Sequence, residues 1–174
     1  MDYRRSLFQI EQWSPFLAKK IWSLTPFLDS PFIIALGLKI QNLTNETVEV
    51  QVPSTLQNRN EWGELHSSVL ISAAQFASQI IWKRHIRPQF EEMTLTDLQS
   101  HFVSRPSKSK AHVRAKLAET EREAVLRKLK VGELVTHEMA LVITDDKDQI
   151  LANINCTWSF RPVRPVALQG EISS

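Results

Sequence analysis

The sequence is poor in the residues that define several special classes of protein. It has one cysteine, four glycines and eight prolines in 174 residues. Cys156 has no second cysteine with which to pair, which excludes a disulfide scaffold within the chain and favours a reducing compartment. The few glycines and prolines exclude a collagen-like or low-complexity chain, and a hydrophobic content of 43% excludes disorder. A length of 174 residues then predicts one domain with a sizeable core.

The sequence also lacks a strong charge of one sign and a long apolar run. Lysine and arginine total 21 and aspartate and glutamate 19, so a net charge of +2 is too small to favour nucleic acid as a partner. The longest apolar run, residues 32–36, is far shorter than the roughly 20 residues of a membrane span. Glu11 and Gln12 interrupt any secretory signal. We therefore expect a cytoplasmic protein without integral membrane association.

No motif for a metal or a nucleotide cofactor is present. There is no HExxH or CxxC spacing, no phosphate-binding loop and no dinucleotide-binding glycine motif, so we expect neither a metal nor a cofactor. Cys156 lies on the apolar side of an alternating segment and is predicted to be core. Packing roles are expected for the aromatic residues Trp62, Trp82, Trp158 and Phe160.

The two ends of the chain are expected to differ from its middle. Apolar residues recur every three or four positions over residues 3–25, and Ser14–Pro15 is a typical helix restart. We expect a helical segment, residues 1–26, packed on the domain. Its tryptophans and lysines also allow a membrane-surface helix. Residues 164–174 are expected to form a flexible tail.

Six strands and two further helices are predicted in the middle. Residues 37–41 and 48–52 alternate with period two around a polar turn and predict a hairpin. Residues 65–84 predict a helix that is apolar around most of its circumference, which is typical of a buried helix. A capping box at 120–123 begins a short helix that Gly132 ends. The remaining predicted strands are 95–103, 112–117, 135–144 and 150–161, and the last has Ile150, Ala152, Ile154, Cys156, Trp158 and Phe160 on one face.

This order of elements defines the fold class. Two strands precede the long helix and four follow it, without the repeated crossover helices of a parallel sheet. We therefore predict an α+β protein in which an antiparallel sheet wraps around one long central helix, with helices at the N-terminus.

Three segments resemble one known family. Asn60, Gly63 and His66 precede the long helix with a spacing similar to that of hotdog-fold acyl-CoA thioesterases of the phenylacetate-pathway type. Residues 102–106 resemble that family's strand ending in a proline turn, and residues 155–162 resemble the last strand of an uncharacterised thioesterase-like subgroup. The resemblance implies a hotdog domain over residues 27–163, a homodimer or a dimer of dimers, and an acyl-CoA or related acyl thioester as the substrate. Where the family carries an acidic residue two turns into the helix, this chain has Gln75.

Thioester hydrolysis needs a polarised carbonyl and an oriented water. Backbone N–H groups at the start of a helix stabilise a developing oxyanion, and we expect those of Glu64 and Leu65 to do so. Gly63 would allow close approach of the thioester, and Asn60 would hold the loop or the carbonyl. A turn or helix-capping role for Asn60 is an equal alternative.

The general base is left open by the sequence. Glu64 is the first candidate and Glu61 the second, although a glutamate at a helix start also has a purely structural explanation. His66 is a base, an organiser of the backbone or an interior residue, and we favour the organiser. Gln75 cannot accept a proton at neutral pH but can orient water.

A small basic cluster could meet the phosphates of coenzyme A at the mouth of the site, or could be a solvated turn. Its members are Arg105, Lys108 and Lys110. The leading function is therefore a thioesterase for a fatty or aryl acyl-CoA. The alternative is a non-catalytic acyl- or lipid-binding protein, which Gln75 favours. A dehydratase of the same fold is a third reading, but its Asp-x-Asn-x-x-His signature is absent.

Overall fold

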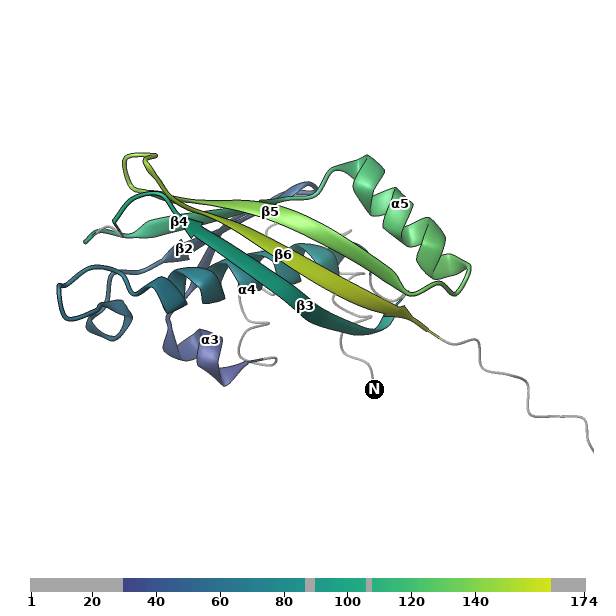
Figure 1. Ribbon diagram of the computed structural model, residues 1–174, viewed down its shortest axis with the longest axis horizontal. Helices are drawn as coiled ribbons and strands as arrows, with labels where there is room; N and C mark the ends of the chain where they lie inside the picture. Colours follow the sequence, from purple (N-terminus) through teal and green to yellow (C-terminus); the bar gives the residue numbers. More distant parts are fainter. Residues whose placement is uncertain (1–29, 87–89, 106–107, 164–174) are drawn as a thin grey trace, which may run out of the picture.

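The computed structural model describes residues 30–86, 90–105 and 108–163, and it has the predicted architecture. One six-stranded antiparallel sheet, in the order β1-β2-β4-β5-β6-β3, curves around the long helix α4 (Figure 1). The elements are α3 (Pro31–Ala35), β1 (Lys39–Leu43), β2 (Thr47–Val52), the 3-10 helix η1 (Leu56–Asn58), α4 (Ser67–Ile86), β3 (Phe90–Phe102), β4 (Ala111–Lys116), α5 (Glu119–Lys130), β5 (Val135–Asp145) and β6 (Ile150–Pro162).

The predicted central helix is confirmed as the core of the fold. α4 lies mainly across β2 and β4, and its side toward the sheet is completely buried. Ser78 on this side accepts a hydrogen bond from the Trp158 indole, 3.1 Å away, and donates to the Gln75 carbonyl at 2.9 Å. The small residues that the sequence places on this helix therefore let the sheet approach closely. They include Ala73, Ala74, Ala77 and Ser78, all buried.

The alternation predicted for the last strand holds except at its first residue. From Ala152 to Phe160 every second side chain is buried, but Ile150 is exposed and Leu151 is buried in its place. The cause is a β-bulge, because Ile143 pairs with Ala152 while Thr144 pairs with Ile150. Leu151 is the extra residue, and the bulge turns its side chain to the core face.

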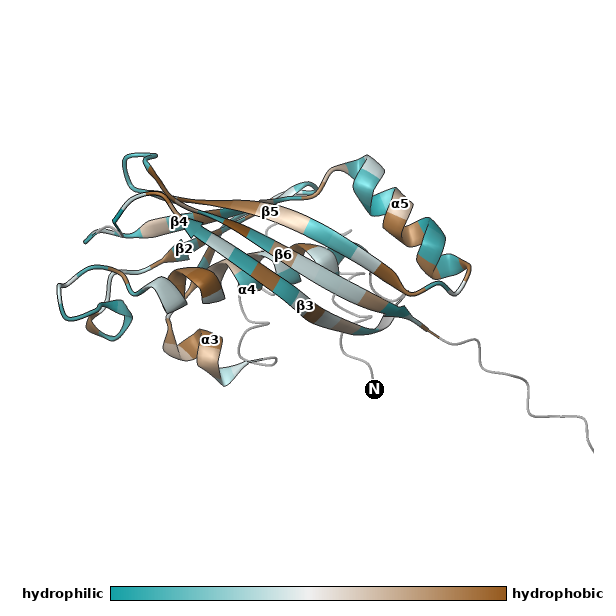
Figure 2. Ribbon diagram, in the orientation of Figure 1, coloured by the Kyte–Doolittle hydropathy of each residue, from teal (hydrophilic) through white to brown (hydrophobic). Residues whose placement is uncertain are grey.

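Several element boundaries also differ from the prediction, most of them by one or two residues. β3 begins at Phe90, five residues before the predicted start. α5 begins at Glu119, before the predicted capping box. The capping position is occupied by Ala118 instead of Thr120, and the Ala118 N–H donates to the Glu121 side chain at 2.9 Å. Figure 2 shows α5 with alternating hydrophilic and hydrophobic patches, and its buried residues Val125 and Leu129 face the domain.

The predicted helical segment 1–26 and the predicted tail 164–174 lie outside the described residues. Among the helices of the described part of the chain, none has both the length and the apolar character that crossing a membrane requires.

Candidate functional site

The loop before α4 is a tight, hydrogen-bonded turn built on Asn60. The Asn60 side-chain oxygen accepts the backbone N–H groups of Trp62 and Glu64, both at 3.0 Å. The Asn60 backbone donates to the Glu64 carbonyl at 2.8 Å and accepts from Gly63 at 3.0 Å. Gly63 has a φ of +75°, a conformation that favours glycine. Asn60 and Gly63 therefore fix the shape of the turn that carries Glu64.

A buried asparagine ties this turn to the domain. The Asn58 side-chain amide donates to the carbonyls of Leu36 at 2.8 Å and Pro53 at 2.9 Å, and the Asn58 carbonyl accepts the His66 N–H at 2.8 Å. Asn58 is completely buried. Sequence reasoning missed this residue, because an asparagine in a polar loop carries no signal that separates a buried anchor from a solvated side chain.

His66 organises the first turn of α4. Its Nδ1 accepts the backbone N–H of Ser68 at 3.2 Å and lies 2.7 Å from the Ser68 hydroxyl. Its carbonyl accepts the N–H of Val69 at 3.0 Å. Because Nδ1 accepts a backbone hydrogen bond, a neutral ring carries its proton on Nε2. His66 is an exposed residue.

The free amides at the start of α4 differ in part from the expected pair. The Glu64 N–H is already bonded to Asn60, so a thioester oxygen would have to displace that bond. The N–H groups of Leu65 and Ser67 have no acceptor among the described residues. Leu65 is completely buried whereas Ser67 is exposed, so the Ser67 N–H, together with the helix dipole, is the donor that the geometry offers to an anion.

Gln75 lies apart from this turn within one chain. Nine residues separate it from His66, which at about 1.5 Å per residue is about 13 Å along the helix axis. Its side chain is exposed on the side of α4 that faces away from the sheet. The turn therefore brings Asn60, Gly63, Glu64 and His66 together, and leaves Gln75 out.

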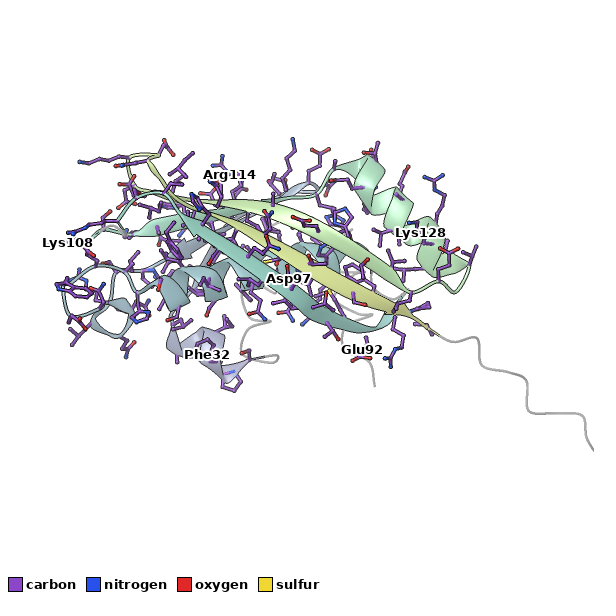
Figure 3. The ribbon with its side chains drawn as sticks, in the orientation of Figure 1. Phe32, Glu92, Asp97, Lys108, Arg114 and Lys128 are labelled. Atoms are coloured by element: carbon purple, nitrogen blue, oxygen red, sulfur yellow. The ribbon has the colours of Figure 1, made fainter. Side chains whose placement is uncertain are left out.

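The predicted basic cluster lies next to the turn. The Ser54 hydroxyl donates to the Lys108 carbonyl at 2.7 Å, and the Arg59 guanidinium donates to the Ser54 hydroxyl at 3.0 Å. Figure 3 places Lys108 at the same end of the molecule as the loop that precedes α4. Arg105, Lys108 and Lys110 are all exposed. Arg59, which sequence reasoning missed, adds a fourth cation from the other loop.

Trp62 corrects one expectation. Trp82, Trp158 and Phe160 are buried as predicted, but Trp62 is 67% exposed, so it is not a packing residue. The cause is its position on the turn, which carries the side chain away from the core.

Of the four described groups with clear pKa shifts, three lie away from this loop, and the fourth, Asp146, lies beside Ser109 and Lys110. A hydrogen bond with the His112 side chain is the main cause that lowers the pKa of Asp146. Burial, followed by the charges of Arg84 and Arg122, lowers the pKa of His85 to about 4. Burial also lowers the pKa of His137, against the opposing effect of nearby carboxylates. Burial raises the pKa of the Cys156 thiol, which is therefore a poor nucleophile. In the described residues, no group of three or more histidine, cysteine, aspartate or glutamate side chains is arranged to hold a metal.

No protein-family model matches the sequence, and no curated protein matches it. Solved structures do match. A protein of unknown function from Pseudomonas aeruginosa, a probable thioesterase, has a TM-score of 0.75 at 16% identity, over 83% of this chain and 95% of its own. A protein of unknown function from Chlorobaculum tepidum has a TM-score of 0.74 at 13% identity, over 86% and 98%. A thioesterase from Haemophilus influenzae has a TM-score of 0.64 at 13% identity, over 84% and 92%. The chain has the hotdog fold that the sequence predicted.

Proposed function

We propose that the protein is a thioesterase that hydrolyses the thioester of a fatty or aryl acyl-CoA. The observation that carries the proposal is the turn before α4. The backbone N–H of the exposed residue Ser67, which has no acceptor among the described residues, lies at the positive end of a 20-residue helix. The carboxylate of Glu64 is half-buried in the same turn. The names of two structural neighbours support the same chemistry.

The reaction assigns one task to each group. Water attacks the thioester carbon, and the carbonyl oxygen becomes an oxyanion that the Ser67 amide and the helix dipole stabilise. Glu64 accepts the proton that the attacking water loses. The carbon–sulfur bond then breaks, the thiolate leaves, and Glu64 returns the proton to the thiolate sulfur. Asn60, Gly63 and His66 hold the turn in the shape that these steps require.

The proposed active form is a homodimer. β3 pairs only with β6 among the described strands, so its other edge is unpaired over 13 residues. A long unpaired edge strand is a template for pairing with another chain, and a second copy is the simplest partner. A dimer or a dimer of dimers would also give Gln75 a role, because it can orient water for the turn of the partner copy when it cannot reach its own. We place this protein in the cytoplasm, where Cys156 stays reduced.

The basic residues next to the turn are proposed to bind the phosphates of coenzyme A. Arg105, Lys108 and Lys110 are exposed, and the hydrogen bond from the Ser54 hydroxyl to the Lys108 carbonyl keeps their loop beside the turn. Charge-assisted contacts of arginine and lysine with phosphate are among the stronger polar interactions in proteins.

A thiol-release assay tests the proposal. Purified protein is given short, medium, long-chain and aryl acyl-CoAs, with Glu64→Gln and Gln75→Ala alongside and Glu61→Gln to test the second candidate base. Loss of a general base typically costs about 100- to 10,000-fold in rate, so Glu64→Gln is expected to fall by at least about 100-fold. Turnover that survives in Glu64→Gln and falls in Glu61→Gln would move the base to Glu61.

A non-catalytic acyl-binding protein is the second candidate. Gln75 favours it, because glutamine stands where the resembling family carries an acid. Acyl-CoA binding without turnover across the whole panel would establish this alternative and exclude the hydrolase.

A further inference from the structure

Trp62 is a large aromatic side chain that the fold does not use. It is 67% exposed, whereas a tryptophan normally buries most of its surface in the core or in an interface. Its backbone is held from both sides, because its own N–H and that of Glu64 bond to Asn60 and the Gly63 N–H bonds to the Asn60 carbonyl. The chain thus presents an indole to solvent on a rigid turn, and binding a ligand to it requires no further ordering of the backbone.

Two loops bring cations close to this turn. Arg59 lies three residues before Trp62, so the two Cα atoms are at most about 11 Å apart. The Arg59 guanidinium is held by the Ser54 hydroxyl at 3.0 Å and lies 3.5 Å from the Lys108 carbonyl. Lys110 follows in the same loop, and its charge contributes to lowering the pKa of the Asp146 carboxyl.

Negative charge is also present near the indole and limits where an anion can bind. Glu61 precedes Trp62 directly and is exposed, and Glu64 lies two residues after it. Glu61 lies between Arg59 and Trp62 in the chain, whereas Glu64 lies on the side of the turn that leads to α4. The Arg59 guanidinium is directed toward the Lys108 carbonyl. An anionic group would therefore be attracted toward Arg59 and Lys108 and away from the two carboxylates.

We propose that Trp62 is a stacking platform for the adenine ring of coenzyme A, and that Arg59 and Lys108 contact its nucleotide phosphates. This inference rests on the proposed function and deepens it, because it makes the nucleotide part of the carrier a determinant of specificity. A flat aromatic ring beside phosphates is the combination that an exposed indole and neighbouring cations recognise. A two-fold contact between copies through the same patch would instead place these cations against each other, which is unfavourable.

The test measures binding separately from turnover. Coenzyme A is titrated by calorimetry into wild-type protein, Trp62→Phe and Trp62→Ala, with Leu134→Ala as the control for an exposed apolar residue elsewhere. Base stacking on an aromatic side chain predicts that Trp62→Ala weakens binding about 5- to 100-fold and that Trp62→Phe retains most of it. Arg59→Ala is expected to weaken binding and to reduce its dependence on salt. Lys128→Ala, at the opposite end of the molecule in Figure 3, is expected to change neither.

A second measurement needs no variant. The wild-type protein is given matched acyl-CoA and acyl-pantetheine, and the proposal predicts at least about fivefold tighter binding of the substrate that carries the nucleotide. Equal binding of the two substrates would overturn it, and so would unchanged coenzyme A binding by Trp62→Ala. A change of oligomeric state in Trp62→Ala by sedimentation would also overturn it, because the indole would then belong to an interface. If the protein releases no thiol, only the proposed hydrolase activity is contradicted, because the calorimetry and the comparison of the two substrates measure binding.

Discussion

The two ends of α4 are stabilised by different means. At its N-terminal end, backbone and side-chain hydrogen bonds around Asn60 and His66 hold an exposed turn. At its C-terminal end, the completely buried Trp82 packs edge-on against His137, with ring centres 4.9 Å apart, and against Phe160 at 5.0 Å. Hydrogen bonds fix geometry while leaving groups accessible, whereas aromatic burial gives stability and hides the groups involved.

The titratable groups show the same contrast. His66 is exposed and its Nδ1 is hydrogen-bonded, while the ring atoms Nε2 of His85 and Nδ1 of His137 are buried without a partner among the described residues. The first arrangement suits a group that must meet a substrate. The second gives two histidines that favour the neutral form, and it makes this end of the helix sensitive to acid. One helix thus has an end built for contact with a ligand and an end built for stability.

The largest expected effect separates the two ends through their tryptophans. Trp82→Ala removes a completely buried indole and is expected to lower the free energy of unfolding by about 3–5 kcal/mol. Trp62→Ala removes an exposed one and is expected to change it by less than about 0.5 kcal/mol. Urea unfolding followed by circular dichroism measures both. Similar losses in the two variants would contradict the assignment of stability to the C-terminal end.

The next effect is acid sensitivity. The folded-state pKa of His85 is about 4, below the unfolded value of about 6.5, so the unfolded chain binds more protons between these pH values. Stability is therefore expected to be fully present above about pH 6.5 and to fall as the pH decreases toward 4. Because the ring is partly exposed, we expect a loss of about 1–2 kcal/mol rather than the full value of the shift.

Urea unfolding at pH 7, 6, 5 and 4 measures this loss, and His85→Gln is expected to remove most of it. The lowered pKa of His137 contributes in the same direction, so a smaller slope should remain in the variant. Equal slopes in wild type and His85→Gln would show that the acid sensitivity arises elsewhere.

Local patterns predicted the elements of this fold, but contacts between distant segments could not be read from them. Apolar residues that recur with a period of two predicted the strands, and those that recur with a period of about 3.6 predicted α4. A strand or helix that buries one face must have its apolar residues at these spacings. The bulge that buries Leu151 depends on the pairing with β5, so the sequence alone led to Ile150 instead. The same holds for Arg59, whose approach to Lys108 joins residues 49 positions apart.

The candidate site was predictable only where it is local. Asn60, Gly63, Glu64 and His66 lie within seven residues, so their resemblance to a known loop could place them in one turn. Their hydrogen bonds were not predictable, and these bonds decide which amides remain free for a ligand. The exposure of Trp62 was not predictable either, because the sequence around a tryptophan does not show whether the turn that carries it points toward the core or toward solvent.

The smallest expected effect distinguishes the roles left open for His66. His66→Ala removes the acceptor for the Ser68 N–H, and loss of such a cap typically costs about 1 kcal/mol. His66→Asn restores an acceptor at the same position without an imidazole. If His66 organises the turn, both stability and thiol release should return with asparagine. If the imidazole itself transfers a proton, His66→Asn will unfold like the wild type in urea and yet release thiol as slowly as His66→Ala. That result would make His66, in place of Glu64, the base of the reaction.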